Sequence, residues 1–399
     1  MGNKLYSYEK EIISVSGESG GVLSDFESYG MPVLYLWGDL SAINKDVAGT
    51  FTYKYGDNTG TSTLKWQGNI SAHFPKKNFT WNKISTPFEA KEGWGVQKKY
   101  CLKANYIDPS QARNIICARL WGRVVASRHT VPTELVNCPN YGAIDGFPII
   151  LVINDEFHGL YTLNIPKDAW TYNLTDGWLI QAEEKADVSS NDTSKLLMDG
   201  TDFTIDENPS EDDEETIKTA FKAMLDAVIA CDGTDWSTVE EYLDIPSAID
   251  YMCFSMMITD HDGIVKNHHY VSYDKQKFYI SDYDMDAVLG NSYDGKTMLS
   301  EQYRPTLNMQ GNHPIFAKLY QYRKEEVITR LKRLIGSVIT PSTLSTTFSQ
   351  YLNAIPLAVR NADSAKWGTM PATTVDGFMQ ITDYYRRRIE WIKETENIQ

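Results

Sequence analysis

The hydrophobic pattern of this chain changes its period once, and that change constrains the fold more than any other feature. Up to about residue 185, short β-branched or aromatic runs lie between turn residues, as at 32–37, 49–55 and 146–153, which is typical of strands. From about residue 216, apolar residues recur at i, i+3 and i+4, which is typical of amphipathic helices. We therefore expect an α+β protein with a β-rich N-terminal lobe (1–185) and a mainly helical C-terminal lobe (216–399).

Some local signals refine this division. One helix is predicted inside the β-rich lobe, with Ser110 as its N-cap and Leu120 near its end. Residues 186–215 form an acidic polar segment, which a solvated loop explains most simply. In the helical lobe, Ser237 and Glu240 have the spacing of a capping box.

Composition excludes several classes of protein. The chain has 399 residues, 42% of them hydrophobic, which is enough for a real core. Its formal net charge of -15 argues against a nucleic-acid partner, because phosphate binding depends on clustered Lys and Arg. No run of about 18 apolar residues occurs, so we expect no membrane insertion. Five widely spread cysteines without a CxxC pair predict reduced, mostly buried thiols.

An acidic motif carries the groups that phosphoryl transfer needs. Asp262 can orient or deprotonate a hydroxyl, Asn267 can offer its amide oxygen to a metal, and Asp284 can hold Mg²⁺ against nucleotide phosphates. If the preceding strand continued, Asp282, Asp284 and Asp286 would share one side, and such crowding of like charges favours a bound cation. The same carboxylates are also compatible with simple caps of helices and turns, because Asp-Gly pairs are common in turns.

Basic candidates for phosphate contact lie in the β-rich lobe. Lys76 and Lys77 are adjacent, and Lys103 precedes Arg113, which lies on the predicted helix. A lysine on a strand is how kinases hold the α- and β-phosphates, and an arginine can neutralise developing charge. A Lys-Lys pair by itself is usually a solvated strand end. No GxxxxGK[ST] phosphate loop occurs in the sequence.

Several separated motifs together resemble the CotH kinase family, the atypical kinases similar to spore coat protein H. They include a Pro-Lys-Lys strand, a Leu-Lys-Ala-Asn-Tyr segment, a Gly-x-Tyr hairpin, a D-x4-N element and a D-x-D-x-x-x-G element. In this chain they lie, in order, at residues 68–79, 102–114, 159–161, 262–267 and 284–290. The resemblance covers roughly residues 30–395, and the combination is far more specific than any single piece.

This resemblance implies an atypical protein-kinase-like fold that uses ATP with Mg²⁺ or Mn²⁺. It also implies transfer of phosphate to Ser or Thr of a protein acceptor, which includes the protein itself. The implied roles are phosphate contact for Lys76 or Lys77, catalysis for Asp262, metal binding for Asp284, Asn267 and Asp286, and shaping of the nucleotide pocket or its core for Lys103, Arg113 and Asn267.

Two positions depart from the family pattern. Asn164 stands where many relatives carry a Glu that can pair with the phosphate-binding lysine, although Glu183 or Glu184 can substitute for it. Tyr283 replaces the usual Trp before the first Asp of the later motif, which is a mild change. The first departure bears on catalysis more than on ancestry.

Two other functions remain open. Variants with this Gly-Leu-Tyr-Thr-Leu-Asn stretch are similar to those carried in bacteriophage tail or fibre genes, where a non-catalytic module serves attachment or assembly in a virion or at a cell surface. A metal-dependent hydrolase acting on a phosphate ester is the third hypothesis. The N-terminus lacks a signal-peptide pattern, so we expect the bacterial cytoplasm or an assembled particle such as a virion or spore coat.

Overall fold

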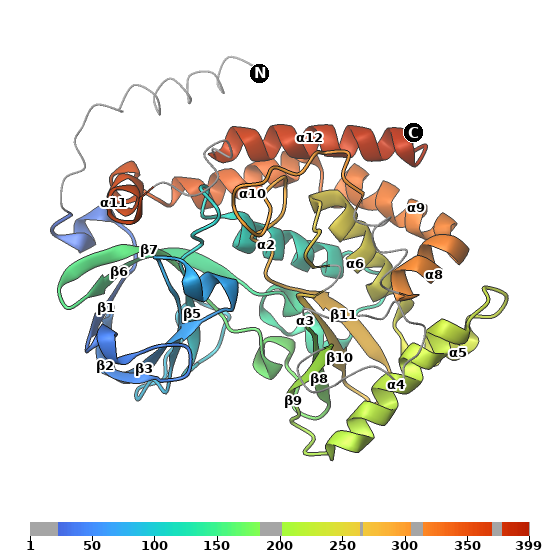
Figure 1. Ribbon diagram of the computed structural model, residues 1–399, viewed down its shortest axis with the longest axis horizontal. Helices are drawn as coiled ribbons and strands as arrows, with labels where there is room; N and C mark the ends of the chain where they lie inside the picture. The colour runs from blue at the N-terminus through green and yellow to red at the C-terminus, as the bar shows by residue number, and fades with distance from the viewer. Residues whose placement is uncertain (1–22, 184–201, 264–265, 305–313, 369–376, 399) are drawn as a thin grey trace.

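The protein contains a closed β-barrel and a second, smaller sheet that is surrounded by helices (Figure 1). The computed structural model describes residues 23–183, 202–263, 266–304, 314–368 and 377–398. Both strands and helices are abundant in these ranges, so the predicted α+β class is confirmed.

The barrel is made by strands in the order β1-β2-β3-β4-β5-β7-β6. Neighbouring strands are antiparallel, except that β1 and β6 run parallel where the barrel closes. Tyr53, Trp81 and Tyr100 are buried and contact one another, as expected for a small barrel that is filled by side chains. The strands are β1 (Val33–Trp37), β2 (Gly49–Tyr55), β3 (Asn58–Gln67), β4 (Asn78–Asn82), β5 (Tyr100–Lys103), β6 (Gly146–Ile153) and β7 (Glu156–Asn164).

The second sheet has four strands in the order β11-β10-β8-β9. Its strands are β8 (Trp178–Ala182), β9 (Phe203–Glu207), β10 (His268–Ser272) and β11 (Phe278–Asp282). β8 follows the barrel in sequence but pairs with β10, so this sheet joins the two parts of the chain. β9 lies within the segment that was expected to be a solvated loop. That expectation was wrong for these residues because Phe203 is buried against Phe221 and Tyr270.

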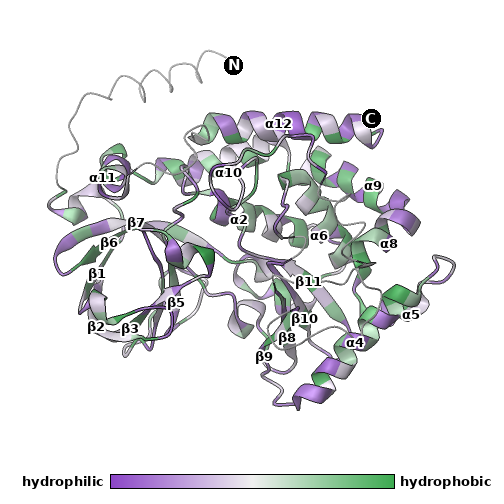
Figure 2. Cartoon of the chain, in the orientation of Figure 1, coloured by the Kyte–Doolittle hydropathy of each residue, from purple (hydrophilic) through white to green (hydrophobic). Residues whose placement is uncertain are grey.

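Helices make up the rest of the molecule. α6 is buried along nearly its whole length and packs against β11, α2, α8, α9 and α12, whereas α12 alternates hydrophilic and hydrophobic residues at the surface (Figure 2). The helices are α2 (Arg113–Ala126), α3 (Thr133–Val136), α4 (Glu214–Ala230), α5 (Ser237–Tyr242), α6 (Ile245–Ile258), α8 (Pro314–Tyr322), α9 (Lys324–Arg333), α10 (Pro341–Asn353), α11 (Leu357–Trp367) and α12 (Gly377–Thr395). α11 packs against β7 and so lies on the barrel.

The start of α2 corrects one prediction. The helix begins at Arg113 rather than just after Ser110. The Asp108 carboxylate accepts hydrogen bonds from the backbone amides of Ala112 at 2.9 Å and Arg113 at 2.8 Å. The Ser110 hydroxyl also donates to Asp108, at 2.7 Å. Asp108 therefore satisfies the free amides of the first turn, which is the role that was expected of Ser110.

Other local predictions have mixed outcomes. β2 and β6 match the predicted runs 49–55 and 146–153. The prediction of a capping box at Ser237 was wrong, because the Asp235 carboxylate accepts the hydrogen bond from the Ser237 backbone amide at 2.8 Å. All five cysteines are buried and free, as predicted. Within the described ranges, no helix has both the length and the apolar character needed to cross a bilayer.

Candidate active site

The first half of the acidic motif follows α6. Thr259 ends this helix in a left-handed conformation, with φ 59°, and the chain then passes through Asp262 before β10 begins. The Asn267 amide nitrogen donates to an Asp262 carboxylate oxygen at 3.0 Å. The two ends of the predicted D-x4-N element are therefore in direct contact. Because the bond uses the nitrogen of the Asn267 amide, its oxygen is the atom that remains for a metal.

The second half of the motif does not continue the strand. β11 ends at Asp282, and Asp284 has a left-handed backbone with φ 62°. The expectation that Asp282, Asp284 and Asp286 share one strand face was therefore wrong, because alternation of side chains requires extended backbone. Asp282 is 1% exposed, whereas the Asp284 side chain is 40% exposed. The turn thus separates an inward carboxyl from one that can meet a ligand.

Lys103 lies beside this turn. It ends β5, and its ammonium nitrogen lies 3.8 Å from an Asp284 carboxylate oxygen. Burial lowers the pKa of the Lys103 ammonium, but Asp284 and Asp286 raise it by more, so its pKa lies above the ordinary value. Lys103 therefore stays positively charged at neutral pH. A small cavity lies at this place, and its lining residues include Lys103, Asn114, Asp284 and Asp286.

Two carboxyl groups of the motif have perturbed proton affinities. Burial raises the pKa of Asp262, in spite of Lys266 with its ammonium 3.5 Å away. Burial also raises the pKa of Asp286, and the neighbouring charge of Asp284 adds to the effect while Lys103 opposes it. A carboxylate with a raised pKa accepts a proton more readily near neutral pH. This property suits Asp262 to the role of a general base.

Asp260 and Asp282 form a second carboxyl pair just behind the motif. Their exposed fractions are 3% and 1%. Burial raises the pKa of Asp260 to about 7 and that of Asp282 well above its usual range, and the proximity of Asp260 adds to the rise at Asp282. An Asp260 oxygen also accepts a hydrogen bond from the Gly263 backbone amide at 2.8 Å. Asp260 therefore fixes the chain at Gly263, and the pair does not carry two full negative charges at neutral pH.

Lys76 is occupied by a structural ion pair. The residue is 2% exposed, and its ammonium nitrogen lies 2.9 Å from an Asp363 carboxylate oxygen on α11. It also donates to the Leu160 carbonyl oxygen at 2.6 Å. Burial lowers the pKa of the Lys76 ammonium, and Asp363 partly offsets this. Lys76 lines the same small cavity as Lys103, but its charge already has a buried partner.

Lys77 is held by its own turn. Its ammonium donates to the carbonyl oxygens of Ala72 at 2.8 Å and Phe74 at 2.5 Å, and it lies over the Trp66 ring at 4.8 Å. The structure thus brings Lys103 to Asp284, whereas Lys76 and Lys77 are engaged elsewhere. Phosphate contact by either of the latter stays a prediction.

Arg113 organises the support of the site. It is fully buried, and it binds Asp108, the Val288 carbonyl oxygen at 3.2 Å and the Gln380 side-chain oxygen at 2.6 Å. The next residue, Asn114, accepts a hydrogen bond from the Met285 backbone amide at 3.2 Å. The first turn of α2 therefore holds the loop that carries Asp284 and Asp286.

The departure at Asn164 lies at the end of β7. Asn164 is opposite Cys101 on β5, and both polar atoms of its side chain are buried without a hydrogen-bond partner in the described part of the chain. The Glu183 carboxylate accepts from the side chains of Gln181 at 2.9 Å and Thr204 at 2.7 Å, which holds it on the second sheet. Glu184 lies outside the described residues. Substitution for the missing glutamate by either residue stays a prediction.

A larger cavity of about 430 Å³ opens between the barrel and the second sheet, a size typical of sites for small ligands. It contacts the motif through Lys167, which lines it and whose ammonium lies 3.8 Å from the centre of the Tyr283 ring. Asp284 follows Tyr283 directly. Lining residues include Thr63, Lys65, Thr80, Lys99, Cys101, Pro166, Lys167, Asp168, Asp206 and Glu207. Sequence patterns missed this cavity because its walls come from six separate segments.

The donor set fits a metal that is shared with a nucleotide. Among the described residues, no three His, Cys, Asp or Glu side chains are arranged to hold an ion by themselves. Mg²⁺ in kinases is bound by one or two carboxylates, an asparagine amide and phosphate oxygens rather than by an all-protein cage. Asp284, Asp286 and the Asn267 amide oxygen supply that kind of partial set.

Comparison with known proteins agrees with the motifs. No curated protein matches this sequence significantly. The family described as CotH kinase protein matches residues 64–392, a range that contains the barrel from β3 onward, the acidic motif and most of α12. The match covers most of the chain, and the protein therefore belongs to the CotH kinase family.

Proposed function

We propose that the protein is an atypical protein kinase that transfers the γ-phosphoryl group of Mg²⁺-ATP to Ser or Thr of a protein acceptor. The observation that carries this proposal is the meeting of two pairs, Asp262 with Asn267 and Lys103 with Asp284, at the junction of the barrel and the helical half. Asp284 also influences the pKa of Asp262, so the two pairs belong to one site. The family description is consistent with this activity.

We also propose a protein-kinase-like arrangement of lobes. The barrel provides Lys103 from its β5 strand, and the helical half provides Asp262, Asn267 and Asp284 from the segments around β10 and β11. The cavity of about 430 Å³ between them is the place for the nucleoside. Phosphates would then lie toward Lys103 and Asp284, because Asp284 follows Tyr283, whose ring centre lies 3.8 Å from the Lys167 ammonium at this cavity.

Each residue of the site has a role in the transfer. Lys103 stays cationic and contacts the phosphates. Asp262 accepts the proton of the acceptor hydroxyl. At the same time the hydroxyl oxygen bonds to the γ-phosphorus, and the bond between the γ-phosphorus and the β–γ bridging oxygen breaks, so that ADP leaves. Asn267 orients Asp262 through their hydrogen bond. When bound at Asp284, Asp286 and Asn267, Mg²⁺ supplies neutralisation of phosphate charge.

Label transfer tests this proposal. Purified protein is incubated with γ-labelled ATP and Mg²⁺ or Mn²⁺, with and without a generic protein acceptor, beside Asp262→Asn, Asp284→Asn and the surface control Asp383→Asn. We expect label on the wild type and the control and none on the two site variants. Melting temperatures measured with and without Mg²⁺-ATP report binding separately from transfer.

The outcomes separate the hypotheses. Nucleotide that raises the melting temperature of the wild type, without label transfer to any acceptor, would indicate a site that binds but does not transfer. Neither label nor a melting shift, with all variants folded, would overturn the kinase assignment and favour the attachment or assembly module.

A further inference from the structure

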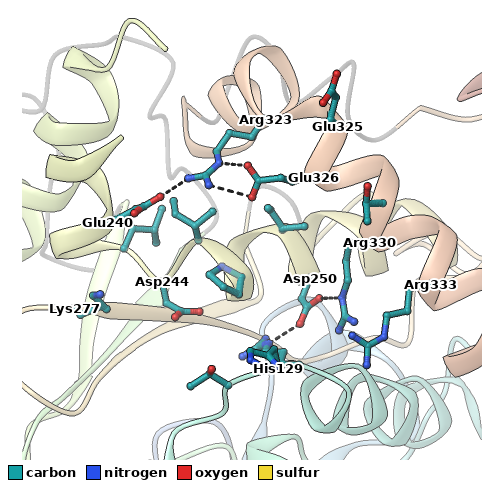
Figure 3. Close-up of a pocket in the computed structure, with 17 residues that line it drawn as sticks. His129, Glu240, Asp244, Asp250, Lys277, Arg323, Glu325, Glu326, Arg330 and Arg333 are labelled. Atoms are coloured by element: carbon teal, nitrogen blue, oxygen red, sulfur yellow. Dashed lines mark hydrogen bonds and ion pairs between the residues drawn. The ribbon is translucent and has the colours of Figure 1, made fainter. Parts of the chain in front are cut away.

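A third cavity, of about 760 Å³, lies away from the candidate active site, and Figure 3 shows the residues that line it. It is formed at the C-terminal end of α2 and the N-terminal end of α6, whereas the motif is at the opposite end of both helices. Each of these helices has 14 residues, which corresponds to a length of about 20 Å. The cavity is therefore a separate site with no part in the proposed phosphoryl transfer.

The floor of this cavity is apolar. Leu243, Ile245 and Ile249 line it, with exposed fractions of 1%, 4% and 5%. Pro246 lies beside them at the surface. The volume of the cavity falls in the range of cavities that hold ligands. An apolar floor of this kind is suited to an aliphatic side chain.

One end of the cavity is basic. Arg128 and Arg330 both pair with Asp250, and Arg333 lies beside Arg330 without an ion pair to any described residue (Figure 3). The Arg128 side chain is 3% exposed, yet one of its terminal nitrogens has no hydrogen-bond partner within the described ranges. A buried donor without an acceptor costs roughly 1–3 kcal/mol. The Arg128 nitrogen is itself buried, so the charge at this end that an acidic ligand can reach is that of the exposed Arg333.

The opposite end is acidic. Arg323 on α9 pairs with Glu240 and with Glu326, and Glu325 also lines the cavity (Figure 3). Three carboxylates and one guanidinium therefore line this end. The two ends carry opposite excess charge, with the apolar floor between them.

We propose that this cavity docks a segment of a partner protein that carries an acidic side chain beside an aliphatic one. The acidic group would meet Arg333, and the aliphatic group would lie on Ile245 and Ile249. The combination of a basic end and an apolar floor favours a polypeptide over a free anion, because a lone phosphate or carboxylate would leave the apolar floor without a contact. Recognition at this cavity does not depend on the proposed phosphoryl transfer.

Selection from a displayed library of random nonapeptides on the full-length protein tests this docking. The selected peptides are then synthesised with a fluorescent label, and their dissociation constants are measured by anisotropy. Arg333→Glu is the test variant. Lys332→Glu is the matched control, since it makes the same charge change on the next residue of α9, is exposed, and does not line the cavity.

We expect the enriched peptides to share an Asp or Glu next to Leu, Ile or Val. Arg333→Glu should weaken binding at least about tenfold, which corresponds to about 1.4 kcal/mol, and Lys332→Glu less than about twofold. Changing the acidic residue of the peptide to Lys should restore binding to Arg333→Glu. Asp284→Asn should bind like the wild type, so this result is independent of the kinase test.

Three results would overturn the proposal. The first is a selection that enriches no common sequence. The second is a set of peptides that bind Arg333→Glu as tightly as the wild type. The third is complete displacement of the peptides by inorganic phosphate at equal concentration, which would identify the cavity as a site for a free anion.

Discussion

Two buried lysines of the barrel differ in what neutralises them. Lys103 faces Asp284 and Asp286, and these carboxylates raise its pKa, whereas burial lowers the pKa of Lys76 in spite of Asp363. The first lysine is therefore a cation beside partly exposed acids that a ligand can reach. The second is one half of a closed ion pair whose role is to hold α11 on the barrel.

Replacement of each lysine by methionine separates these roles. Lys103→Met should lower the rate of label transfer roughly 10²–10³-fold, the usual effect of removing one charge-stabilising donor, with a much smaller effect on the free energy of unfolding. Lys76→Met should instead cost about 3–5 kcal/mol of stability, because it leaves the Asp363 carboxylate buried without its cation. Urea unfolding and label transfer are measured on both variants, and the reverse pattern would return phosphate contact to Lys76.

The sequence alone could not show which of these lysines faces the acidic motif. Adjacent Lys76 and Lys77 look like the phosphate-binding feature because the family resemblance places a lysine pair there. The partner of Lys76 is Asp363, which is 287 residues away, and no periodicity or motif connects positions at that separation. By contrast, Asp262 and Asn267 were predictable as a contacting pair, since only five residues separate them and the family motif fixes their spacing.

At the scale of single elements, α11 is the helix that ties the C-terminal part of the chain to the barrel. The Trp367 indole nitrogen donates to the His158 carbonyl oxygen at 2.8 Å, and the two rings lie 5.3 Å apart. Lys366 donates to the Phe157 carbonyl oxygen at 2.6 Å. The burial of His158, together with the charges of Lys366 and Lys76, lowers its pKa from 6.5 to about 3.

This shift predicts a pH dependence of stability. Below about pH 6.5 the unfolded chain binds a proton at His158 that the folded protein does not bind until about pH 3, so acidification in this window destabilises the fold by up to about 1.4 kcal/mol per pH unit. His158→Phe keeps a ring in place and cannot titrate. As the pH falls from 6 to 4, the free energy of unfolding of His158→Phe minus that of the wild type should therefore increase by up to about 1.4 kcal/mol per pH unit. Urea unfolding at several pH values measures the difference, and parallel curves would contradict the assignment.

Element boundaries show which signals sequence patterns carry. β2 and β6 were predictable because strand periodicity is local. The start of α2 was misplaced because Asp108 reaches past Ser110 to the first free amides, and two candidate caps three residues apart or fewer cannot be ranked from sequence. The strand β9 was missed because Phe203, its one buried side chain, lies in a segment dominated by acidic residues.

At the scale of the whole molecule, Asp250 is a hub of the helical half. It is 1% exposed and lies on α6, where it pairs with Arg128, which follows α2, and with Arg330 on α9. Arg330 also donates to the Val124 carbonyl oxygen at 3.0 Å. Three helices that are distant in sequence therefore share one carboxylate.

Removal of this carboxylate should destabilise the protein strongly. Asp250→Asn leaves two largely buried guanidinium groups without their counter-ion, and a loss of about 3–5 kcal/mol in the free energy of unfolding is expected. Asp383→Asn is the control, since Asp383 is exposed and its ion pairs with described residues lie within α12, where each such pair contributes about 0.3–0.5 kcal/mol. Equal losses in the two variants, measured by urea unfolding, would show that Asp250 is not a hub.

Closure of the molecule by the Lys76–Asp363 pair has a consequence for its synthesis. The 287 residues between these partners take roughly 15–60 s to translate at about 5–20 residues per second. For much of that time, once β7 has been translated, all the barrel strands exist while the ammonium of Lys76 has no counter-ion and the surface under α11 is uncovered. Newly made N-terminal lobes are thus a natural client of chaperones, and they become complete only when one of the last helices to be translated arrives to close them.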